Sequence, residues 1–397
     1  MNFIELIQKS TDDAESPAQY YYWSALATIS AVLKNSVFLD KFRYKLFPNI
    51  YVLLVGDSGL RKGPPVNLAK RLVRGVGNNR VISGRGTIQG AMGRLSQSYT
   101  CENGTVLMDS TGLLISEEFA AFLVDDPAGL KILTDLYDGH FHEGEYVGFL
   151  KANPFELKNV CLTMIAASNE TNLKEVMPQN ANGSGFIART AIVYAKIARG
   201  INSLTTRPIN MVPEDELILY LLEVAKLKGE FKYSDQGRKL YDKWYTDFRT
   251  ATMGKTDPTG ILNRIHDQVL KVAMLISVSR RLDLIVGEDD MQEALDVCVN
   301  CVTGVKKITL GSGRSQVAPQ TAIILNYLMG QAGCRTTRQK LLQKFWGELD
   351  AYDLDRIIET MSQAGAITIT KNGKHTIYCV PQNIVDQYQT YKTGDDL

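Results

Sequence analysis

Apolar and polar positions follow two patterns along the chain, which predict a mixed α/β half followed by a mostly helical half. All five residues at 51–55 are apolar or aromatic, which predicts a strand buried on both faces. Residues 160–167 repeat that pattern, and shorter apolar runs at 113–115 and 190–195 predict two more strands. Helically spaced apolar residues lie between these runs, so the predicted fold class of this half is α/β.

Helical spacing of apolar residues is also found before the strand at 51–55 and after the strand at 190–195. Residues 1–15 predict a short amphipathic helix, and Ser16-Pro17 opens a longer one at 18–33, because proline suits the first turn of a helix. Between 214 and 308 the period is helical almost throughout. This stretch therefore predicts an all-α subdomain packed on the α/β core.

The last part of the chain predicts a winged helix. Three helical patterns precede two short alternating runs that surround Asn372-Gly373, a pair typical of hairpin turns. Three helices and a two-stranded wing form a winged helix, which is a variant of the helix-turn-helix. The helices are predicted at 318–331, 336–346 and 351–364, and the strands at 366–370 and 375–380.

The composition is that of an ordinary globular protein. The chain has 397 residues, of which 45% are hydrophobic and 22% charged, and its net charge is +1. This balance excludes a grossly basic protein, so any contact with nucleic acid would come from local patches. No apolar run reaches the ~20 residues of a membrane span, and the N-terminus lacks the layout of a signal peptide. We therefore expect an intracellular protein with no membrane partner.

Six scattered cysteines are consistent with a reducing compartment. Cys298 and Cys301 form a C-x-x-C pair, but they fall inside a helical pattern and lack a second pair at zinc spacing. Buried helix residues are therefore favoured over a metal or redox site. His140 and His142, in a hairpin predicted at 137–149, also lack a well-spaced third ligand, so a polar loop is favoured there.

The loop after residues 51–55 carries the clearest chemical signal. A strand, a glycine-bearing loop with one lysine, and a helix follow one another, which is the architecture of a phosphate-binding P-loop. Loop amides and the helix N-terminus donate to phosphate oxygens, and the lysine adds a charge for the terminal phosphates. The predicted nucleotide-binding residues are Gly56, Asp57, Ser58, Gly59, Leu60, Arg61, Lys62 and Gly63.

The loop departs from the motif G-x-x-x-x-G-K-[ST] at two positions. Gly56 and Lys62 are in place, but Arg61 replaces the second glycine. Gly63 replaces the hydroxyl residue, which would bind Mg²⁺. On spacing alone, an ordinary glycine-rich turn between a strand and a helix stays the alternative.

Two acids follow the apolar run at 113–116. Glu117 and Glu118 have the form of a Walker B pair, in which one carboxylate holds Mg²⁺ and the other orients or deprotonates the attacking water. Asp109, which follows residues 106–108, is the rival, but the strand before the glutamate pair is cleaner. Adjacent glutamates on a solvated surface are the alternative explanation.

Two further polar residues lie at strand ends. Asn169 follows the strand at 160–167 and fits a sensor of the γ-phosphate, with a plain turn residue as the alternative. Arg189 precedes the strand at 190–195 and could reach the nucleotide of a neighbouring subunit, with a surface arginine as the alternative. The aromatic cluster at 20–23 is predicted to serve packing in preference to base stacking.

Basic residues of the predicted winged helix suit contacts with phosphate. The third helix and its entry are acidic, with Asp350, Asp353 and Asp355, so docking on a protein stays an alternative to DNA binding. The candidate DNA contacts are Arg335, Arg338, Lys340, Lys344, Lys371 and Lys374.

Two segments resemble a known family. Ser16-Pro17 with residues 23–33, followed by residues 48–63 with their Arg-Lys-Gly ending, resemble P-loop proteins of phages, prophages and mobile elements. That family is described as replicative-helicase-like, or as a primase-helicase-associated domain. It is similar to the AAA+, or additional-strand, ATPases related to phage and viral initiator helicases. The likeness covers roughly residues 10–310.

The resemblance implies a role for each candidate residue. It places Lys62 on the β- and γ-phosphates of ATP, Glu117 on Mg²⁺, and Glu118 as the catalytic base. Asn169 is then the γ-phosphate sensor, and Arg189 a finger that acts on a neighbouring subunit.

The implied protein is an ATP-driven ring motor, favoured as a hexamer, in the cytoplasm of a bacterial host. Its partners would be single-stranded or forked DNA and an initiator, primase or other replication protein. A helicase loader or remodelling ATPase, and a non-hydrolysing, nucleotide-gated DNA-binding regulator, are the alternatives.

The predicted order of domains follows from these segments. It comprises N-terminal helices at 1–45, a P-loop ATPase core at 46–210, a helical subdomain at 211–308, a linker at 309–317, a winged helix at 318–382 and a tail at 383–397.

Overall fold

The computed structural model describes residues 2–84, 87–101, 104, 106–124, 129–138, 145–148, 155–176, 185–201, 212–255, 257, 259–309, 318–346, 349–372 and 375–386. The chain divides into two compact units, Met1–Lys306 and Lys307–Leu397. The ranges predicted as N-terminal helices and P-loop core, and nearly all of the predicted helical subdomain, fall in the first unit. Residues 310–317 of the predicted linker lie outside the described residues.

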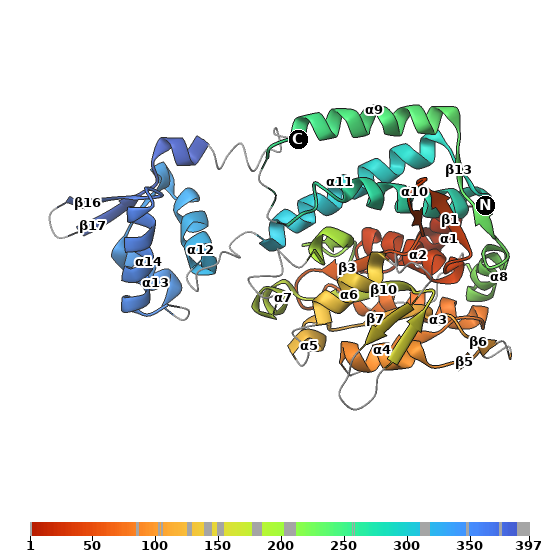
Figure 1. Cartoon of the computed structure of the whole chain (residues 1–397). Helices are drawn as coiled ribbons and strands as arrows, with labels where there is room; N and C mark the ends of the chain where they lie inside the picture. Colours follow the sequence, from red (N-terminus) through yellow and green to blue (C-terminus); the bar gives the residue numbers. More distant parts are fainter. Residues whose placement is uncertain are drawn as a thin grey trace. The chain divides into compact units, whose positions relative to one another are not determined.

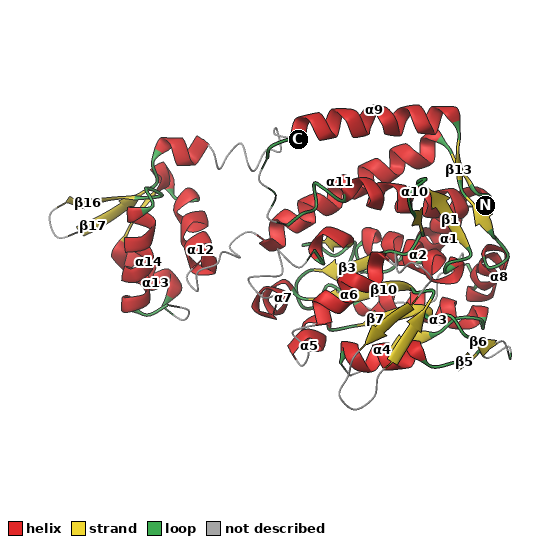
Figure 2. Ribbon diagram, in the orientation of Figure 1, coloured by secondary structure: helices red, strands yellow, loops and turns green. Residues whose placement is uncertain are grey.

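A five-stranded parallel sheet forms the centre of the first unit (Figures 1 and 2). Its strands, in spatial order, are β11 (Thr190–Tyr194), β3 (Tyr51–Val55), β10 (Cys161–Ser168), β7 (Thr111–Ser116) and β4 (Val81–Ser83). Val55 lies opposite Ser168 on one side and opposite Tyr194 on the other. The carboxyl ends of these strands therefore meet at one edge of the sheet, and the α/β class is confirmed.

The central strands form where the sequence is continuously apolar. Every side chain of β3 is at most 1% exposed, as expected for a strand covered on both faces. Helices surround the sheet: α1 (Phe3–Ser10), α2 (Ala18–Leu33), α3 (Gly63–Val76), α4 (Ile88–Ser96), α5 (Phe119–Val124), α6 (Gly129–Asp138) and α7 (Glu170–Val176).

Helix α2 is buried over almost its whole length. Tyr20, Tyr21 and Trp23 are at most 5% exposed, which confirms that these aromatic residues serve packing. The helix packs against α3 and against strands β10 and β3, so an apolar helix covers this part of the sheet.

The stretch predicted as all-α contains four helices, α8 (Glu214–Val224), α9 (Asp235–Thr252), α10 (Ile265–Arg281) and α11 (Glu288–Thr309). The all-α prediction is wrong in detail, because the stretch also contains short strands, β12 (Gly229–Glu230), β13 (Lys232–Tyr233) and β14 (Ile285–Val286). Strand β12 pairs with β1 (Val37–Asp40), which pairs in turn with β2 (Lys45–Leu46). Strands of two residues are too short to leave a periodic signal in the sequence.

The other short strands form local hairpins: β5 (Tyr99–Thr100) with β6 (Val106–Leu107), and β8 (Glu145–Gly148) with β9 (Phe155–Lys158). The hairpin predicted at 137–149 is therefore misplaced, because residues 137–138 end α6 and β8 pairs with a later strand. Residues 139–144, with His140 and His142, lie outside the described residues.

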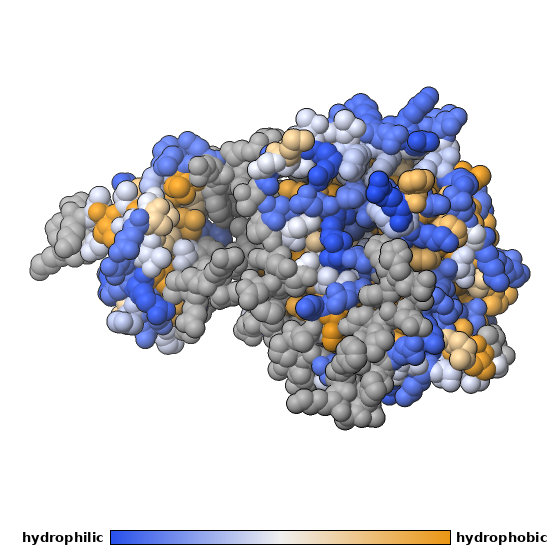
Figure 3. Space-filling view, viewed as in Figure 1, coloured by the Kyte–Doolittle hydropathy of each residue, from blue (hydrophilic) through white to orange (hydrophobic). Residues whose placement is uncertain are grey.

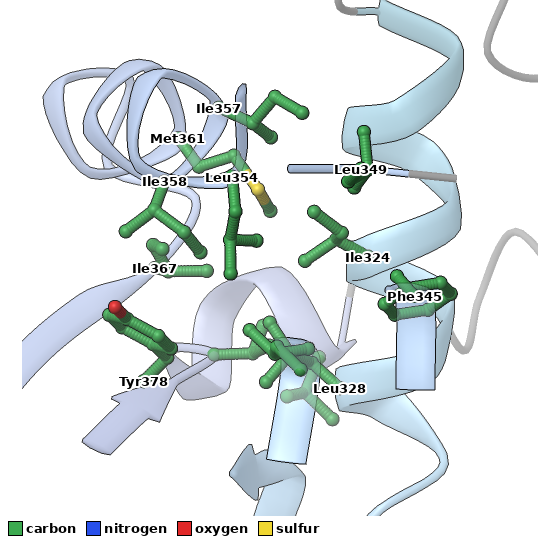
Figure 4. Close-up of a cluster of buried hydrophobic side chains, with 13 residues drawn as sticks. Ile324, Leu328, Phe345, Leu349, Leu354, Ile357, Ile358, Met361, Ile367 and Tyr378 are labelled. Atoms are coloured by element: carbon green, nitrogen blue, oxygen red, sulfur yellow. The ribbon is translucent and has the colours of Figure 1, made fainter. Parts of the chain in front are cut away.

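The described residues of the second unit form three helices of at least eight residues, a further helical segment at 382–386 and a three-stranded antiparallel sheet. Its elements are α12 (Ala318–Met329), η4 (Ala332–Cys334), β15 (Arg335–Thr337), α13 (Arg338–Phe345), α14 (Ala351–Gln363), β16 (Thr368–Asn372) and β17 (His375–Cys379). The predicted hairpin is present, and β15 adds a third strand in the order β15-β17-β16. Thirteen buried side chains fill its core, including Ile324, Leu354 and Tyr378 (Figure 4).

Among the described residues on the face shown in Figure 3, small hydrophobic patches alternate with hydrophilic residues. Among the helices that the structure describes, none is long and apolar enough to cross a membrane.

Candidate functional site

Three loops meet at the carboxyl edge of the sheet. They follow β3, β10 and β7, which are neighbours in the sheet and run parallel. The first loop holds Lys62, the second begins at Asn169, and the third begins with Glu117 and Glu118. Residues from three distant parts of the sequence are thus brought to one place, where ligands commonly bind in open α/β sheets.

Lys62 closes back over the loop that follows β3. Lys62 Nζ donates to the carbonyl oxygens of Gly56 and Asp57, each at 2.7 Å. Burial lowers the pKa of Lys62, while the carboxylates of Glu118 and Asp57 act in the opposite direction. The ammonium therefore sits at the mouth of the loop, held by neutral carbonyls that a phosphate could replace.

Gly56 is required by close packing. A Cβ at this position would lie 2.6 Å from the carbonyl oxygen of Ala195 and 2.7 Å from the hydroxyl of Tyr20. Tyr20 donates that hydroxyl to the carbonyl of Val55 at 2.8 Å, at the end of β3. Tyr20 therefore fixes the entry to the loop, a role that the sequence pattern did not indicate.

Arg61 occupies the position at which the motif has its second glycine. Its φ is 51°, so the backbone adopts the left-handed conformation that glycine favours. Ser16 donates to the carbonyl of Arg61 at 2.7 Å, and Glu15 forms an ion pair with its guanidinium at 3.0 Å. These contacts from the segment before α2 hold the loop shape although the glycine is missing.

Gly63 faces the acidic pair. A Cβ on Gly63 would lie 3.6 Å from Glu117 Oε2, which is an ordinary van der Waals distance. Asn67, one helical turn further along α3, donates to Glu117 Oε1 at 3.1 Å. The place of the missing hydroxyl is therefore open space bordered by a carboxylate and an amide. Asn67 was not predicted as a site residue, although a residue four positions after Gly63 on a helix lies on the same face as Gly63.

The carboxylate of Glu117 beside this space is a group that could hold a hard divalent cation. Mg²⁺ is usually held by one or two carboxylates together with water and substrate phosphates, and Glu117 supplies the carboxylate. The second acid, Glu118, accepts from Ser168 Oγ at 3.3 Å, so the ends of β7 and β10 are linked by a hydrogen bond.

Asn169 has a local structural role. Its Oδ1 accepts from the backbone amide of Asn172 at 2.6 Å and so caps the start of α7. The capping contact uses the oxygen, and the amide nitrogen is the group that a γ-phosphate sensor would use.

Asp109 lies at the other edge of the sheet. It precedes β7, and its Oδ1 accepts from Asn159 Nδ2 at 2.8 Å. The geometry therefore places Glu117 and Glu118 beside the P-loop and their rival away from it.

Arg189 is also at the opposite edge. It ends the short helix η3 (Ile187–Arg189) immediately before β11, about 16 Å of strand from the P-loop edge. Its side chain is 7% exposed and pairs with Asp138, with Nε to Oδ1 at 3.0 Å. Burial opposes ionisation of Asp138, but the hydrogen bond and charge of Arg189 outweigh it and lower the pKa of that carboxyl. Arg189 does not join the other candidate residues.

A basic depression begins at the P-loop and continues along α3. Its volume is about 720 Å³, and the lining residues are Gly63, Pro64, Asn67, Lys70, Arg71, Arg74 and Glu117. Arg71 forms a bidentate pair with Glu214, with the shortest contact at 2.7 Å. The positive charge of this face suits an anionic ligand such as a polyphosphate.

The DNA-contact candidates of the second unit differ in exposure and in the partners of their side chains. Arg335, Lys340 and Lys344 are exposed. Arg338 forms a bidentate pair with Asp355 of α14, with both N–O distances 2.9 Å. The side chain of Lys371 and the whole of Lys374 lie outside the described residues.

The cysteine pair is structural. Cys298 and Cys301 are buried in α11, and burial raises the pKa of both thiols. Within the described part of the chain, no group of three His, Cys, Asp or Glu residues could hold a metal ion. Comparison with known protein families and with curated proteins finds no match to this chain.

Proposed function

We propose that this protein binds and hydrolyses ATP at the carboxyl edge of its parallel sheet. The free energy of hydrolysis would drive its action on DNA. The observation that carries the proposal is the meeting of Lys62, Glu117 and Glu118 at that edge. The two glutamates lie 55 and 56 residues after Lys62 in the sequence. A lysine in a glycine-bearing loop and an acidic pair on a nearby strand are the parts that phosphoryl transfer requires.

Each part has a task in this proposal. Lys62 exchanges the carbonyls of Gly56 and Asp57 for β- and γ-phosphate oxygens. Glu117 would hold Mg²⁺, which neutralises developing charge on the phosphates. Glu118 orients the attacking water and accepts its proton, while the amide of Asn169 contacts the γ-phosphate.

The order of strands supports an additional-strand ATPase. One strand, β10, lies between the P-loop strand β3 and the acidic strand β7, and all three are parallel. This insertion characterises the AAA+ class, to which the sequence also bears a resemblance. The class commonly forms rings, so we propose a homo-oligomeric ring, favoured as a hexamer.

The arrangement of the second unit supports action on DNA. Three helices with a small antiparallel sheet are the parts of a winged helix, and Arg335, Lys340 and Lys344 are exposed on its β15–α13 segment. We propose a replicative helicase of a phage or mobile element, which acts on single-stranded or forked DNA in the bacterial cytoplasm. A helicase loader of the same fold would hydrolyse ATP but separate no strands.

DNA-stimulated ATP hydrolysis tests the proposal. We expect Lys62→Ala to lower turnover by about 100-fold or more, since it removes the charge that contacts the phosphates. Lys226→Ala, which changes an exposed lysine of the same unit outside these loops, serves as the matched control and should retain turnover within about twofold. Absence of hydrolysis in the unmodified protein would contradict the enzymatic proposal.

A second function is favoured by Gly63. A P-loop without the hydroxyl is also compatible with a nucleotide-gated, DNA-binding regulator. Tight binding of ATP with no turnover, together with retention of duplex DNA by the second unit, would favour this alternative.

A further inference from the structure

The β1–β2 hairpin exposes an aromatic side chain at its tip. Phe42 is 94% exposed, whereas the strand residues Val37 and Leu39 of the same hairpin are at most 2% exposed. An isolated apolar side chain on the surface is ordinary. The backbone beneath this one is not ordinary.

Phe42 adopts a left-handed conformation with φ of 67°. The amide of Arg43 donates to the carbonyl of Lys41 at 2.8 Å, which closes a three-residue turn around Phe42. A turn of this kind with positive φ at its centre is rare and strained. Asp40 Oδ1 accepts from the amide of Phe42 at 2.7 Å and so reinforces the turn.

Glycine or asparagine would adopt this conformation with less strain than phenylalanine. The side chain of Phe42 is almost fully solvated, so it offers the fold little packing energy in return. Strain of this kind is concentrated at functional sites. The hairpin therefore presents an exposed aromatic ring on a constrained backbone.

Cationic residues flank Phe42 in the sequence of the hairpin tip. Lys41, Arg43 and Lys45 alternate with Phe42 and Tyr44 at the tip, and Arg43 and Lys45 are exposed. Lys45 Nζ lies 4.3 Å above the ring of Phe38, which orients this charge on the flank of the hairpin. A sequence in which cations and aromatic residues alternate suits a ligand in which phosphates and flat bases alternate.

Aromatic residues on α9 continue this surface. Lys41 Nζ lies 5.8 Å from the ring centre of Tyr241, which connects the hairpin to the helix. Trp244 and Phe248 stack on each other with ring centres 5.2 Å apart, and Tyr241 stacks on Tyr245 at 6.0 Å.

Helix α9 is unusually exposed for its length. Of its 18 residues, all of which the structure describes, Gly237 and Tyr241 are buried. The helix lies along the outer side of the first unit (Figure 1). Trp244, Tyr245 and Phe248 are therefore only partly covered, and Tyr245 is 37% exposed.

We propose that the hairpin tip and the aromatic face of α9 bind single-stranded nucleic acid, with Phe42 stacked on a base and the neighbouring cations on the backbone phosphates. Single strands expose the faces of their bases, whereas a duplex buries them, so stacking selects the single strand. This names the strand-binding surface of the DNA-acting function proposed above and rests on that function only for the class of ligand.

Fluorescence anisotropy of a labelled oligothymidylate bound to the full chain, without nucleotide, tests the stacking role. We expect Phe42→Ala to weaken binding about tenfold, because it removes the stack on one base. Phe42→Trp should bind within about twofold of the unmodified protein. Phe42→Leu, which keeps an apolar side chain of similar size, should lose binding as Phe42→Ala does. Equal binding by Phe42→Ala or by Phe42→Leu would overturn the proposal.

Salt dependence tests the phosphate contact. Affinity for a single strand falls as salt rises, and removing one phosphate contact should reduce the magnitude of the slope of log affinity against log salt by about 0.7. We expect this reduction for Arg43→Gln. Lys226→Gln changes an exposed lysine of the same unit and should leave the slope unaltered. An unaltered slope for Arg43→Gln would contradict the phosphate contact.

Thermal unfolding separates binding from folding. Phe42→Gly relieves the left-handed strain, so its melting temperature should stay equal or rise by about 2 °C while oligonucleotide binding falls. A lowered melting temperature would show that Phe42 serves the fold and would contradict the proposal.

Two further measurements separate this proposal from its competitors. Anionic lipid vesicles provide the membrane comparison: loss of vesicle binding by Phe42→Ala with unaltered oligonucleotide binding would overturn the inference. Lys62→Ala should bind the oligonucleotide normally, so failure of ATP hydrolysis and failure of strand binding are observed independently.

Discussion

Gly63 is the residue at which the loop differs most from the phosphate-binding motif, and its surroundings explain the difference. The space in front of it is bordered by Glu117 Oε2, 3.6 Å from a virtual Cβ, and by Asn67 Nδ2 at 4.0 Å. Asn67 and Glu117 are already joined by a hydrogen bond. A small hydroxyl side chain would therefore fit here without displacing its neighbours.

We predict that Gly63→Ser lowers the Mg²⁺ concentration needed for half-maximal ATP hydrolysis by roughly threefold or more, because the hydroxyl adds an oxygen ligand. Gly63→Ala adds the Cβ without the oxygen and is the matched control. Titration of turnover with Mg²⁺ measures the effect. Identical titrations for the serine and alanine variants would show that position 63 does not contact the metal.

Lys271 is a second residue whose surroundings have a measurable consequence. Its side chain is 2% exposed, and Nζ donates to the backbone oxygen of Asn49 at 3.0 Å and to Oδ1 of the same residue at 2.8 Å. Burial lowers the pKa of Lys271 from 10.5 to about 8. Between these two values the unfolded chain binds more protons than the folded one, so stability contributed by this residue rises with pH.

We predict that the difference in free energy of unfolding between the unmodified protein and Lys271→Met rises between pH 8 and 10 by about 1 kcal/mol per pH unit. Groups remote from Lys271 titrate equally in both proteins and cancel in the difference. Urea denaturation at several pH values measures it. A difference independent of pH would contradict the lowered pKa of Lys271.

At the scale of elements, an ion pair joins the end of α6 to η3. Asp138 of α6 pairs with Arg189, and Arg264 lies 3.4 Å from the same carboxylate. Removal of one partner leaves the other charge partly buried without compensation. The contact therefore fastens the amino end of β11 to the helix that covers the sheet.

We predict that Arg189→Gln lowers the free energy of unfolding by about 3 kcal/mol, whereas Arg264→Gln, at a 44% exposed position, changes it by less than about 1 kcal/mol. Chemical denaturation gives both values, and hydrolysis per folded molecule is measured in parallel. Unaltered stability with hydrolysis reduced about 1,000-fold would instead support a finger that acts on a neighbouring subunit.

At the scale of the whole molecule, the chain consists of two units with separate cores. Among the described residues, the second unit has its own cluster of thirteen buried hydrophobic side chains. The first unit contains the complete candidate nucleotide site, the hairpin and α9. ATP hydrolysis and duplex binding, which the proposals assign to different units, can therefore be separated by truncation.

We predict that a fragment of residues 1–309 retains ATP hydrolysis within about twofold and binds duplex DNA at least about tenfold more weakly than the full chain. The removed unit carries the exposed Arg335, Lys340 and Lys344. Hydrolysis assays and duplex-binding titrations compare the two proteins. Equal duplex binding by the fragment would remove the second unit from the proposed DNA contacts.

Local pattern was sufficient wherever burial is continuous along the chain. The helix at 18–33 and the strand at 51–55 have the bounds predicted from sequence, since apolar residues cluster on short, uninterrupted segments there. The three helices and the hairpin predicted in the second unit are present, with bounds that differ from the prediction by at most two residues. Two-residue strands such as β12 and β14 were not predicted, because their pairing depends on partners far away in the chain.

The sequence by itself therefore determined the α/β class, the loop around Lys62 and the acids that could serve it. Only the tertiary structure decided which of these residues meet, because strand order and register set distances between segments that are remote in sequence. It brought Asn67 to Glu117, separated Asp109 and Arg189 from the P-loop edge, and connected the Phe42 hairpin to the aromatic residues of α9 through Lys41.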